Sequence, residues 1–382
     1  MTQRPIYLDY NATTPIDPEV VEAMRPYLEE HFGNPSSSHA YGRLAREAVQ
    51  QAREQVAELI GAAPDEIVFT SGGSEANNMV IKGVVARSPG QRCRLVTSAV
   101  EHPAVLEPCL ALEELGHQVE ILPVDRYGWL DPQRLTSVSE RGTVLVTLMH
   151  ANNEVGTIQS VGEVAEWAHA RGISVHTDAA QSIGKLAVSV DELGVDFLSL
   201  AGHKFYAPKG VGALYIRRGQ KLPPLIHGAA HEDGRRAGTE NVLLVVGLGK
   251  AAELARQRLE RTATHSAAMR DRLWSRLKER LDDLAWNGKR EACLPNTLSV
   301  AIKGTMASKL IERIGSEVAA SAGSACHAEG AAVSTVLWAM GFSVERAVST
   351  LRLSVGRSTT PREIDRAAEV ISREVRAARA GG

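Results

Sequence analysis

The sequence is poor in cysteine. It has four in 382 residues, Cys93, Cys109, Cys293 and Cys326, and they lie far apart. No two form a Cys-x-x-Cys pair, and none belongs to a Cys/His cluster with the spacing of zinc ligands, so the pattern excludes a disulfide framework and a zinc ribbon. A reduced, cytosolic setting is therefore expected, with no metal site.

The sequence also has no excess of charge and no long apolar run. The formal net charge is −2 and the isoelectric point is near 6.7. Binding to nucleic acid or to an anionic membrane needs a basic patch or stripe. The apolar stretch 242–248 is far too short to cross a bilayer, and residues 1–10 are polar and interrupted by proline, unlike a secretory signal. A soluble, cytoplasmic protein that binds neither membrane nor nucleic acid is predicted.

What the sequence does contain is an alternation of helical and strand patterns. Asp17 and Pro18 form an N-cap pair that predicts a helix to about residue 30, and apolar spacing predicts another over 43–60, ending at Gly61. Short β-branched runs predict strands at 67–69, 95–97, 119–122, 144–148, 173–176, 197–200 and 212–216. Helical stretches separate most of them, which predicts an α/β domain with a sheet between helices.

A chain of this length exceeds one hydrophobic core, so a second domain is expected. Residues 241–284 have a helical pattern without strands and are interpreted as a bridge. Beyond them strands are predicted at 297–301, 318–320 and 349–354, and helices at 308–314, 333–340 and 361–378. The expected division is a large domain of residues 15–258 and a small α+β domain of residues 1–14 and 259–382, which carries Cys326.

Five of the apolar runs end in polar groups. They are followed by residues 70–75, 101–102, 150–154, 178–181 and 203–204. Ligands of an open α/β sheet bind at the carboxyl ends of its strands, so these residues define one candidate site. The glycine-rich turn 72–74 could hold a phosphate at a helix N-terminus. Alternatively it is a tight turn with Ser74 as the N-cap.

Asp178 and Lys204 each follow a buried strand. Asp178 could be a helix N-cap or a carboxylate that pairs with a cationic ring nitrogen, the partner that pyridoxal phosphate needs. Lys204 stands beside His203 at a strand end, where burial would let it lose its charge and react with a carbonyl. Two nearby lysines, Lys185 and Lys209, have no such position, and lysines are usually solvated.

Three further residues each allow two interpretations. His102 could stack on a flat ring and move protons, or be structural. Cys326 lies in the small, glycine-bracketed stretch 321–330, which predicts a partly exposed loop, whereas most thiols, Cys109 and Cys293 included, are buried. Arg352, on an edge-like strand, could be a surface arginine or could bind a substrate carboxylate with two hydrogen bonds.

With these residues in place the sequence resembles the cysteine desulfurases of the class V aminotransferase superfamily, in particular the group that serves iron–sulfur cluster assembly and nitrogen fixation. The resemblance covers nearly the whole chain in order. It rests on residues 7–15 (YLDYNATTP), 33–37 (GNPSS), 70–75 (TSGGSE), 101–102 (EH), 152–156 (NNEVG), 178–182 (DAAQS), 202–204 (GHK), 236–239 (RAGT), 323–326 (GSAC) and the strand of Arg352.

The resemblance implies pyridoxal 5'-phosphate as the cofactor and the type I fold of pyridoxal-phosphate transferases, with a mostly parallel sheet. The residues it assigns to the cofactor are Gly73, Ser74, His102, Asn153, Asp178, Gln181, His203, Lys204 and Thr239. Lys204 would bind the cofactor covalently, His102 would stack on the ring, and Asp178 would pair with its nitrogen. Gln181 would meet the ring hydroxyl, and Thr239 would reach the phosphate from the second subunit of a homodimer.

The implied activity converts L-cysteine to L-alanine. Lys204 and His102 would be catalytic, Arg352 and Asn153 would bind the substrate, and Cys326 would be the nucleophile. Cys326 would carry the sulfur as a persulfide to an acceptor protein, for iron–sulfur clusters, thiolated nucleic acid or cofactor biosynthesis. A transaminase has no use for the thiol, whereas a selenocysteine lyase and a silent sulfur-relay protein remain alternatives.

The sequence departs from the family pattern in two places. Ala201 stands where a serine is common, so one hydroxyl contact to the phosphate should be missing. The last predicted helix is followed by only a few residues, without the longer tail by which some members engage a cluster scaffold. The identity of the sulfur acceptor is therefore left open.

Overall fold

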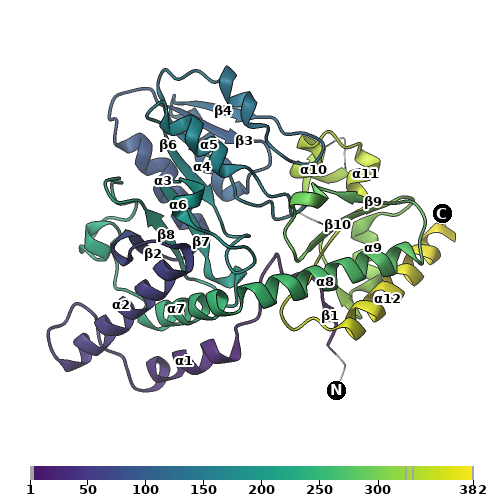
Figure 1. Cartoon of the computed structure of the whole chain (residues 1–382), viewed down its shortest axis with the longest axis horizontal. Helices are drawn as coiled ribbons and strands as arrows, with labels where there is room; N and C mark the ends of the chain where they lie inside the picture. Colours follow the sequence, from purple (N-terminus) through teal and green to yellow (C-terminus); the bar gives the residue numbers. More distant parts are fainter. Residues whose placement is uncertain (1–3, 323–324, 329–330, 381–382) are drawn as a thin grey trace.

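The computed structural model describes residues 4–322, 325–328 and 331–380, with side chains for 4–322 and 333–380 (Figure 1). A larger region is built around one central sheet. Its strands are β2 Ile67–Thr70, β3 Arg94–Ser98, β4 Gln118–Leu122, β5 Thr143–Thr147, β6 Ser174–Asp178, β7 Phe197–Ala201 and β8 Gly212–Ile216. All seven predicted strands are present, each within about two residues of its predicted bounds.

The strands lie side by side in the order β2-β8-β7-β6-β5-β3-β4. β8 pairs antiparallel with both of its neighbours, β2 and β7, and the remaining pairs are parallel. Six of the seven strands therefore point the same way. Their carboxyl ends meet at one edge of the sheet, as the strand-end motifs predicted.

Helices cover both faces of this sheet. On one face lie α3 Gly73–Ala86 and α4 Pro103–Glu114, and on the other α2 Ala40–Ile60, α5 Val161–His169 and α7 Val242–Gln257, with α6 Val190–Leu193 beside them. A sheet covered on both faces needs buried side chains that point alternately to its two faces, and strand β8 has this alternation. Leu214 and Ile216 pack toward α3, while Ala213 and Tyr215 pack toward α7. The predicted α/β layering is confirmed.

The predicted helix ends at the N-terminal side are also confirmed. The Asp17 side chain accepts a hydrogen bond from the Glu19 N–H at the start of α1 Pro18–Glu29. Helix α2 ends at Gly61, which has the left-handed φ of 69° that favours glycine. Its start lies three residues before the predicted one, because His39 provides an N-cap.

The bridge is two helices rather than one. α7 ends at Gln257, and α8 Leu259–Lys278 begins after a break at Arg258. Figure 1 shows α8 running from the larger region into the smaller one. The predicted helical stretch also ends earlier than residue 284, because β9 Leu284–Asn287 follows as an edge strand that the sequence pattern did not reveal.

The smaller region has a three-stranded sheet in the order β14-β10-β9, with β10 Thr297–Ile302 and β14 Thr350–Ser354. Helices α8, α9 Ala307–Ile314 and α12 Pro361–Ala380 pack against it around a separate apolar core. The N-terminal strand β1 Ile6–Tyr7 pairs here with β11 Val318–Ala319. The α+β character is as expected, and the division into 15–258 and 1–14 with 259–382 stays a prediction.

The segment around Cys326 differs from its prediction. Strand β12 Ala325–Ala328 pairs antiparallel with β13 Ala331–Ser334, so the backbone forms a hairpin where an irregular loop was expected. Helix α10 Thr335–Ala339 consequently starts two residues later than predicted and is followed by α11 Val344–Val348. Among the residues described here, no helix is both long and apolar enough to span a membrane.

Candidate active site

A cavity of about 340 Å³ lies at the carboxyl edge of the central sheet. It is lined by residues from the ends of β3, β5, β6 and β7, from the start of α3, from the N-terminal segment and from β14. They are Asn11, Ala12, Gly73, Ser74, Asn77, His102, Ala104, Met149, Ala151, Asn153, Asp178, Ala180, Gln181, Ala201, His203, Lys204 and Arg352. The cavity thus brings together nine of the eleven predicted site residues.

Asp178 is the last residue of β6 and is buried. Its Oδ2 accepts a hydrogen bond from Asn77 Nδ2 at 2.8 Å, and its Oδ1 accepts one from the Ala180 N–H at 2.9 Å. Both oxygens are therefore held in fixed directions. Asn77 comes from the buried face of α3, and its Oδ1 has no partner among the described residues.

Lys204 ends the single 3-10 turn, Gly202–Lys204, that follows β7. Its Nζ donates to the carbonyl oxygens of Asn11 at 2.8 Å and Ala12 at 2.9 Å. Burial, and then the charge of Arg352, lower its pKa to about 8. About a tenth of this amine is then uncharged at pH 7, far more than for a solvated lysine.

His102 caps α4 and faces the cavity. Its Nδ1 accepts from the Ala104 N–H at 3.0 Å, so the proton of the neutral ring lies on Nε2. Burial lowers the pKa of His102, which favours the neutral ring. The preceding Glu101 accepts from the Met149 N–H at 2.9 Å and from Ser98 Oγ at 2.6 Å. These bonds tie the loop that carries His102 to the end of β5.

One end of the cavity suits an anion. Helix α3 starts at Gly73 after Gly72, whose φ of 149° is strained for other residues, and no side chain caps the helix. Its first N–H groups are therefore without intrahelical partners. Ser74 lies in the first turn, so the alternative interpretation of Ser74 as the N-cap is wrong. Ala201 lies next to this helix start, because a Cβ placed on Gly73 would be 3.4 Å from the Cβ of Ala201.

His203 lies beside this anion end. Its Nδ1 is 3.1 Å from Thr13 Oγ1. Burial, followed by the charge of Lys204, lowers the pKa of His203 to about 4. The ring is therefore a neutral hydrogen-bonding group at pH 7 and adds no charge to the site.

Arg352 also lines the cavity and is buried, so the interpretation as a surface arginine is wrong. Its Nη2 forms an ion pair with Asp9 Oδ1 at 2.8 Å, and its Nη1 donates to the Asn153 carbonyl oxygen at 3.2 Å. Within the described residues its Nε has no partner, and Nη1 and Nη2 make only one bond each, so N–H groups of a buried guanidinium remain for a ligand.

Gln181 lines the cavity after β6, and Lys185 lies behind it. Gln181 Nε2 donates to the Asn11 carbonyl oxygen at 3.0 Å, and its Oε1 accepts from Lys185 Nζ at 2.8 Å. Lys185 is buried, so the expectation that it is solvated is wrong. Lys209, the other flanking lysine, is exposed as expected.

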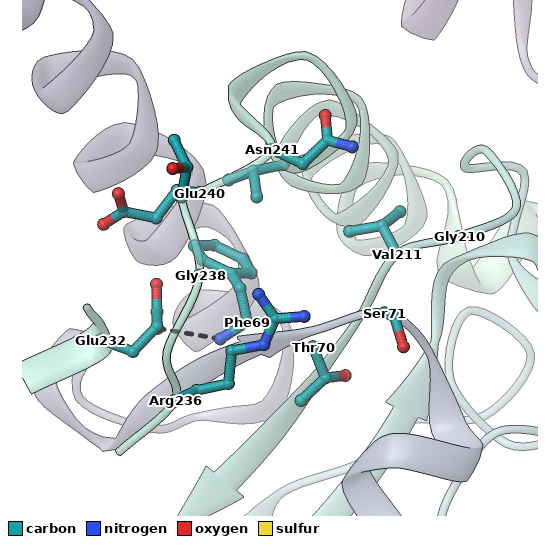
Figure 2. Close-up of a pocket in the computed structure, with 12 residues that line it drawn as sticks. Phe69, Thr70, Ser71, Gly210, Val211, Glu232, Arg236, Gly238, Glu240 and Asn241 are labelled. Atoms are coloured by element: carbon teal, nitrogen blue, oxygen red, sulfur yellow. Dashed lines mark hydrogen bonds between the residues drawn. The ribbon is translucent and has the colours of Figure 1, made fainter. Parts of the chain in front are cut away.

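Thr239 does not line this cavity. It lines a second one of about 250 Å³, whose other residues include Phe69, Ser71, Arg236 and Asn241 (Figure 2). Arg236 pairs with Glu75 in the first turn of α3 at 2.9 Å, so the second cavity adjoins the same helix end. The predicted contact of Thr239 was one to the other subunit's cofactor, and within one chain it stays a prediction.

Cys326 lies in β12, where its backbone pairs with Val333. Its side chain is outside the described residues, so its predicted role also stays a prediction. The other three cysteines are buried or half-buried free thiols. Burial raises the pKa of Cys109 to about 12 and that of Cys293 to about 11, which makes both poor nucleophiles, as expected.

The sequence interpretation missed several residues of the site. Asn11 and Asp9 stand within the motif 7–15, but no local pattern shows that this segment reaches the sheet. Asn77 is three residues after Ser74 in α3, and this spacing could have placed it on the inner face of the helix. Among the described residues, no group of three or more His, Cys, Asp or Glu side chains could hold a metal ion.

The residues of the cavity fit pyridoxal phosphate. The volume lies within the range of small-molecule sites, about 300–1,000 Å³. An uncapped helix end at one side suits the phosphate, a fixed carboxylate on the floor suits a ring nitrogen, and an amine with a lowered pKa suits the aldehyde. These three features come from α3, β6 and the turn after β7, and they face one space.

Comparison with known proteins agrees with this geometry. Residues 6–367 match the family model described as aminotransferase class-V. The chain therefore belongs to that family, whose members depend on pyridoxal phosphate. A protein of Dictyoglomus turgidum named cysteine desulfurase IscS is 46% identical over 372 residues, 97% of this chain and 94% of that protein. Its namesake in Methanosarcina thermophila is 44% identical over 96% and 91% of the two chains.

Solved structures give the same grouping. A NifS-like protein superimposes with a TM-score of 0.92 at 36% identity, over 98% of this chain and all of that one. A structure titled SspA in complex with cysteine has a TM-score of 0.82, also at 36% identity, over 94% of this chain. Within the aminotransferase class-V family, the chain belongs with the cysteine desulfurases. The predicted family and fold class are confirmed.

Proposed function

We propose that this enzyme is a cysteine desulfurase that converts L-cysteine to L-alanine and moves the sulfur to Cys326. The observation that carries the proposal is that Asp178, Lys204 and Arg352 line a single cavity. Asp178 supplies a carboxylate for the cofactor, Lys204 a reactive amine and Arg352 a group that binds a carboxylate. An enzyme that uses pyridoxal phosphate on an amino-acid substrate needs all three. That relatives are named cysteine desulfurase, and that a similar structure is titled as a complex with cysteine, supports this substrate.

The proposed cofactor contacts follow from the geometry of the walls. Gly73, Ser74 and His203 hold the phosphate, with Ala201 contributing no hydroxyl. Asp178 keeps the ring nitrogen protonated, and its orientation by Asn77 serves that task. When bound, pyridoxal phosphate supplies an electron sink that stabilises negative charge at the substrate Cα. His102 stacks on the ring, with its neutral imidazole held by the Ala104 N–H.

The proposed substrate contacts come from other residues of the same cavity. The buried Arg352 receives the carboxylate of L-cysteine through the N–H groups that Asp9 and Asn153 leave free, while its pair with Asp9 fixes the plane of the guanidinium. Asn153 contacts both the substrate and the ring of the cofactor. Lys204 holds the cofactor at rest, and once released its Nζ removes the proton from Cα. The lowered pKa of this amine suits a base that works near neutral pH.

Cys326 then takes the sulfur. Its thiolate attacks the substrate sulfur, an S–S bond forms, and the Cβ–S bond breaks with its electrons going to Cβ, which is protonated. The products are L-alanine and a persulfide on Cys326, so atoms and electrons balance without an external oxidant. An acceptor protein next removes the outer sulfur. A cytoplasmic setting, where thiols stay reduced, is consistent with this chemistry.

We also propose a homodimer in which Thr239 reaches the phosphate site of the other subunit. The second cavity supports this, because it places Thr239 at the surface near Arg236 and the end of α3 that begins the phosphate site. Mixed dimers of a Thr239→Ala chain and a Lys204→Ala chain provide the test. One of their two sites then has both native residues if Thr239 acts across the interface, and neither does if it acts within its own chain.

The main experiment is a spectrum and a product assay. Purified protein with pyridoxal phosphate should absorb in the visible range, change its spectrum on addition of L-cysteine, and release L-alanine, with sulfide when a thiol reductant is present. Cys326→Ala should keep the absorbance and lose sulfide release, whereas Cys93→Ala, which changes a thiol outside the cavity, should keep both. Normal turnover by Cys326→Ala would show that another group is the nucleophile.

A further inference from the structure

Lys185 occupies an unusual position for a lysine. After β6 the chain makes successive turns, in which the Lys185 N–H donates to the Ser182 carbonyl oxygen at 3.0 Å. These turns bring Lys185, four residues beyond Gln181, back to the Gln181 side chain, with 2.8 Å between Lys185 Nζ and Gln181 Oε1. The side chain is only 7% exposed. The Lys185 side chain extends inward and ends at Gln181, which lines the cavity.

Nothing in the surroundings compensates the charge of this lysine. In the described part of the chain no carboxylate forms an ion pair with Lys185, and its Nζ donates to Gln181 Oε1 at 2.8 Å. Burial and two cations, Lys204 and Arg352, lower its pKa well below the ordinary value. A buried amine without an anionic partner destabilises a fold, so the position is better explained by the site than by stability.

Lys185 and the Asn11 carbonyl oxygen together set which way the Gln181 amide is oriented. Lys185 Nζ donates to the amide oxygen on one side, and the Asn11 carbonyl, which can only accept, takes the NH2 group on the other. There Nε2 donates to the Asn11 carbonyl oxygen at 3.0 Å. Its second N–H remains for the cavity. The same Asn11 oxygen accepts from Lys204 Nζ, so the two lysines are linked through this carbonyl group and the Gln181 amide.

We propose that Lys185 is a positioning residue: it holds the Gln181 amide with its NH2 group toward the cavity, where that group donates to the ring hydroxyl oxygen of bound pyridoxal phosphate. This inference rests on the proposed function, because it takes the cavity as the cofactor site. Without Lys185 only the bond to the Asn11 carbonyl oxygen opposes rotation of the amide, which turns over more readily and then sets its oxygen toward the ring oxygen. One hydrogen bond to the cofactor is lost, and the two oxygens repel each other.

The test measures how tightly the apoenzyme binds two cofactors, followed by absorbance. The variants are wild type, Lys185→Met, and the control Lys309→Met, which changes an exposed lysine on α9. Lys185→Met should bind pyridoxal phosphate about three- to tenfold more weakly, the range of one hydrogen bond. It should bind 3-deoxypyridoxal phosphate, which lacks the ring hydroxyl, as tightly as wild type does. Lys309→Met should match wild type with both cofactors.

A double variant tests that Lys185 acts through Gln181. In a Gln181→Met background, adding Lys185→Met should change the affinity for pyridoxal phosphate less than twofold. Equal weakening with both cofactors, or an undiminished effect in the Gln181→Met background, would overturn the inference. If Lys185→Met does not fold, Gln181→Met alone must show the same selectivity between the two cofactors. A wild-type protein that binds neither cofactor would instead overturn the proposed function.

Discussion

Asp9 and Arg352 form an ion pair at the wall of the cavity, with 2.8 Å between Oδ1 and Nη2, although 343 residues separate them in the chain. Asp9 follows the strand that pairs with β11, and Arg352 lies in the middle of β14. The small region therefore assembles the proposed substrate receptor from its first and its last strand. The pair fixes the guanidinium before a substrate arrives, so binding does not have to order it.

Asp9→Asn tests this arrangement. The amide keeps the shape and can still accept from Nη2, but the ion pair is lost and Arg352 becomes freer to turn. We expect the KM for L-cysteine to rise about tenfold with kcat changed less, because ground-state and transition-state binding lose the same contact. Steady-state kinetics measure both constants. Glu22→Gln, which removes an exposed carboxylate on α1, is the control and should leave KM unchanged.

The stability of the apoenzyme should report the charge of Lys204. Its pKa near 8 in the folded protein lies below its unfolded value, so burial opposes folding fully below pH 8. As pH rises from 8 toward 10.5 the folded state loses this proton first, and stability rises. Lys204→Met removes the effect. The free energy of unfolding of Lys204→Met minus that of wild type should therefore be about 2 kcal/mol larger at pH 7 than at pH 10.

Denaturant unfolding of both apoproteins at several pH values checks this prediction. Other titrating groups are present in both chains and cancel in the difference. Lys309→Met, at an exposed position, should give a difference from wild type that does not depend on pH. An equally flat result for Lys204→Met would mean that Lys204 keeps an ordinary pKa.

Asn77→Ala should weaken the proposed interaction of Asp178 with the ring nitrogen of the cofactor. The Nδ2 of Asn77 is 2.8 Å from Asp178 Oδ2, and without it the carboxylate can rotate away from the position in which it meets the ring. We expect kcat to fall about tenfold, since one charge-assisted hydrogen bond contributes about 1.5 kcal/mol. The cofactor should stay bound. Gln50→Ala, on the exposed face of α2, is the control, and equal activity of the two variants would exclude a role for Asn77.

Ala201→Ser should improve cofactor binding. Ala201 lines the anion end of the cavity beneath Gly73, and a hydroxyl there adds one donor for the phosphate. We expect the dissociation constant for pyridoxal phosphate to fall about threefold to tenfold. Ala201→Val makes the matched comparison. Its methyl groups approach Gly73 without a donor, so its affinity should fall below that of wild type, in a titration of each apoprotein.

Much of the large region was predictable because its patterns are local. The seven strands are short apolar runs between turn residues, and the polar residues at their ends mark the site in the sequence. Asp17, Pro18 and Gly61 act within one helical turn of themselves, so their capping roles follow from the sequence alone. The same holds for Lys204 and Asp178, each of which directly follows a buried strand.

Other features follow no local pattern. The edge strand β9 has few residues, and its pairing with β10 decides its conformation. The hairpin of β12 and β13 likewise forms through cross-strand bonds, so small residues that suggest a loop fold as strands there. Lys185 belongs to a residue type that is usually solvated, and its burial depends on packing around the turn after β6.

The sequence by itself determined the family, the sheet with helices on both faces, and the chemical groups at the strand ends, because each depends on residues close together in the chain. The tertiary structure alone decided that Asp9 and Asn11 reach the site, that Arg352 is buried and paired, and that Lys185 lies beneath Gln181. Those relations join segments that are distant in the chain or depend on packing, and contacts of that kind leave no periodic trace in the sequence.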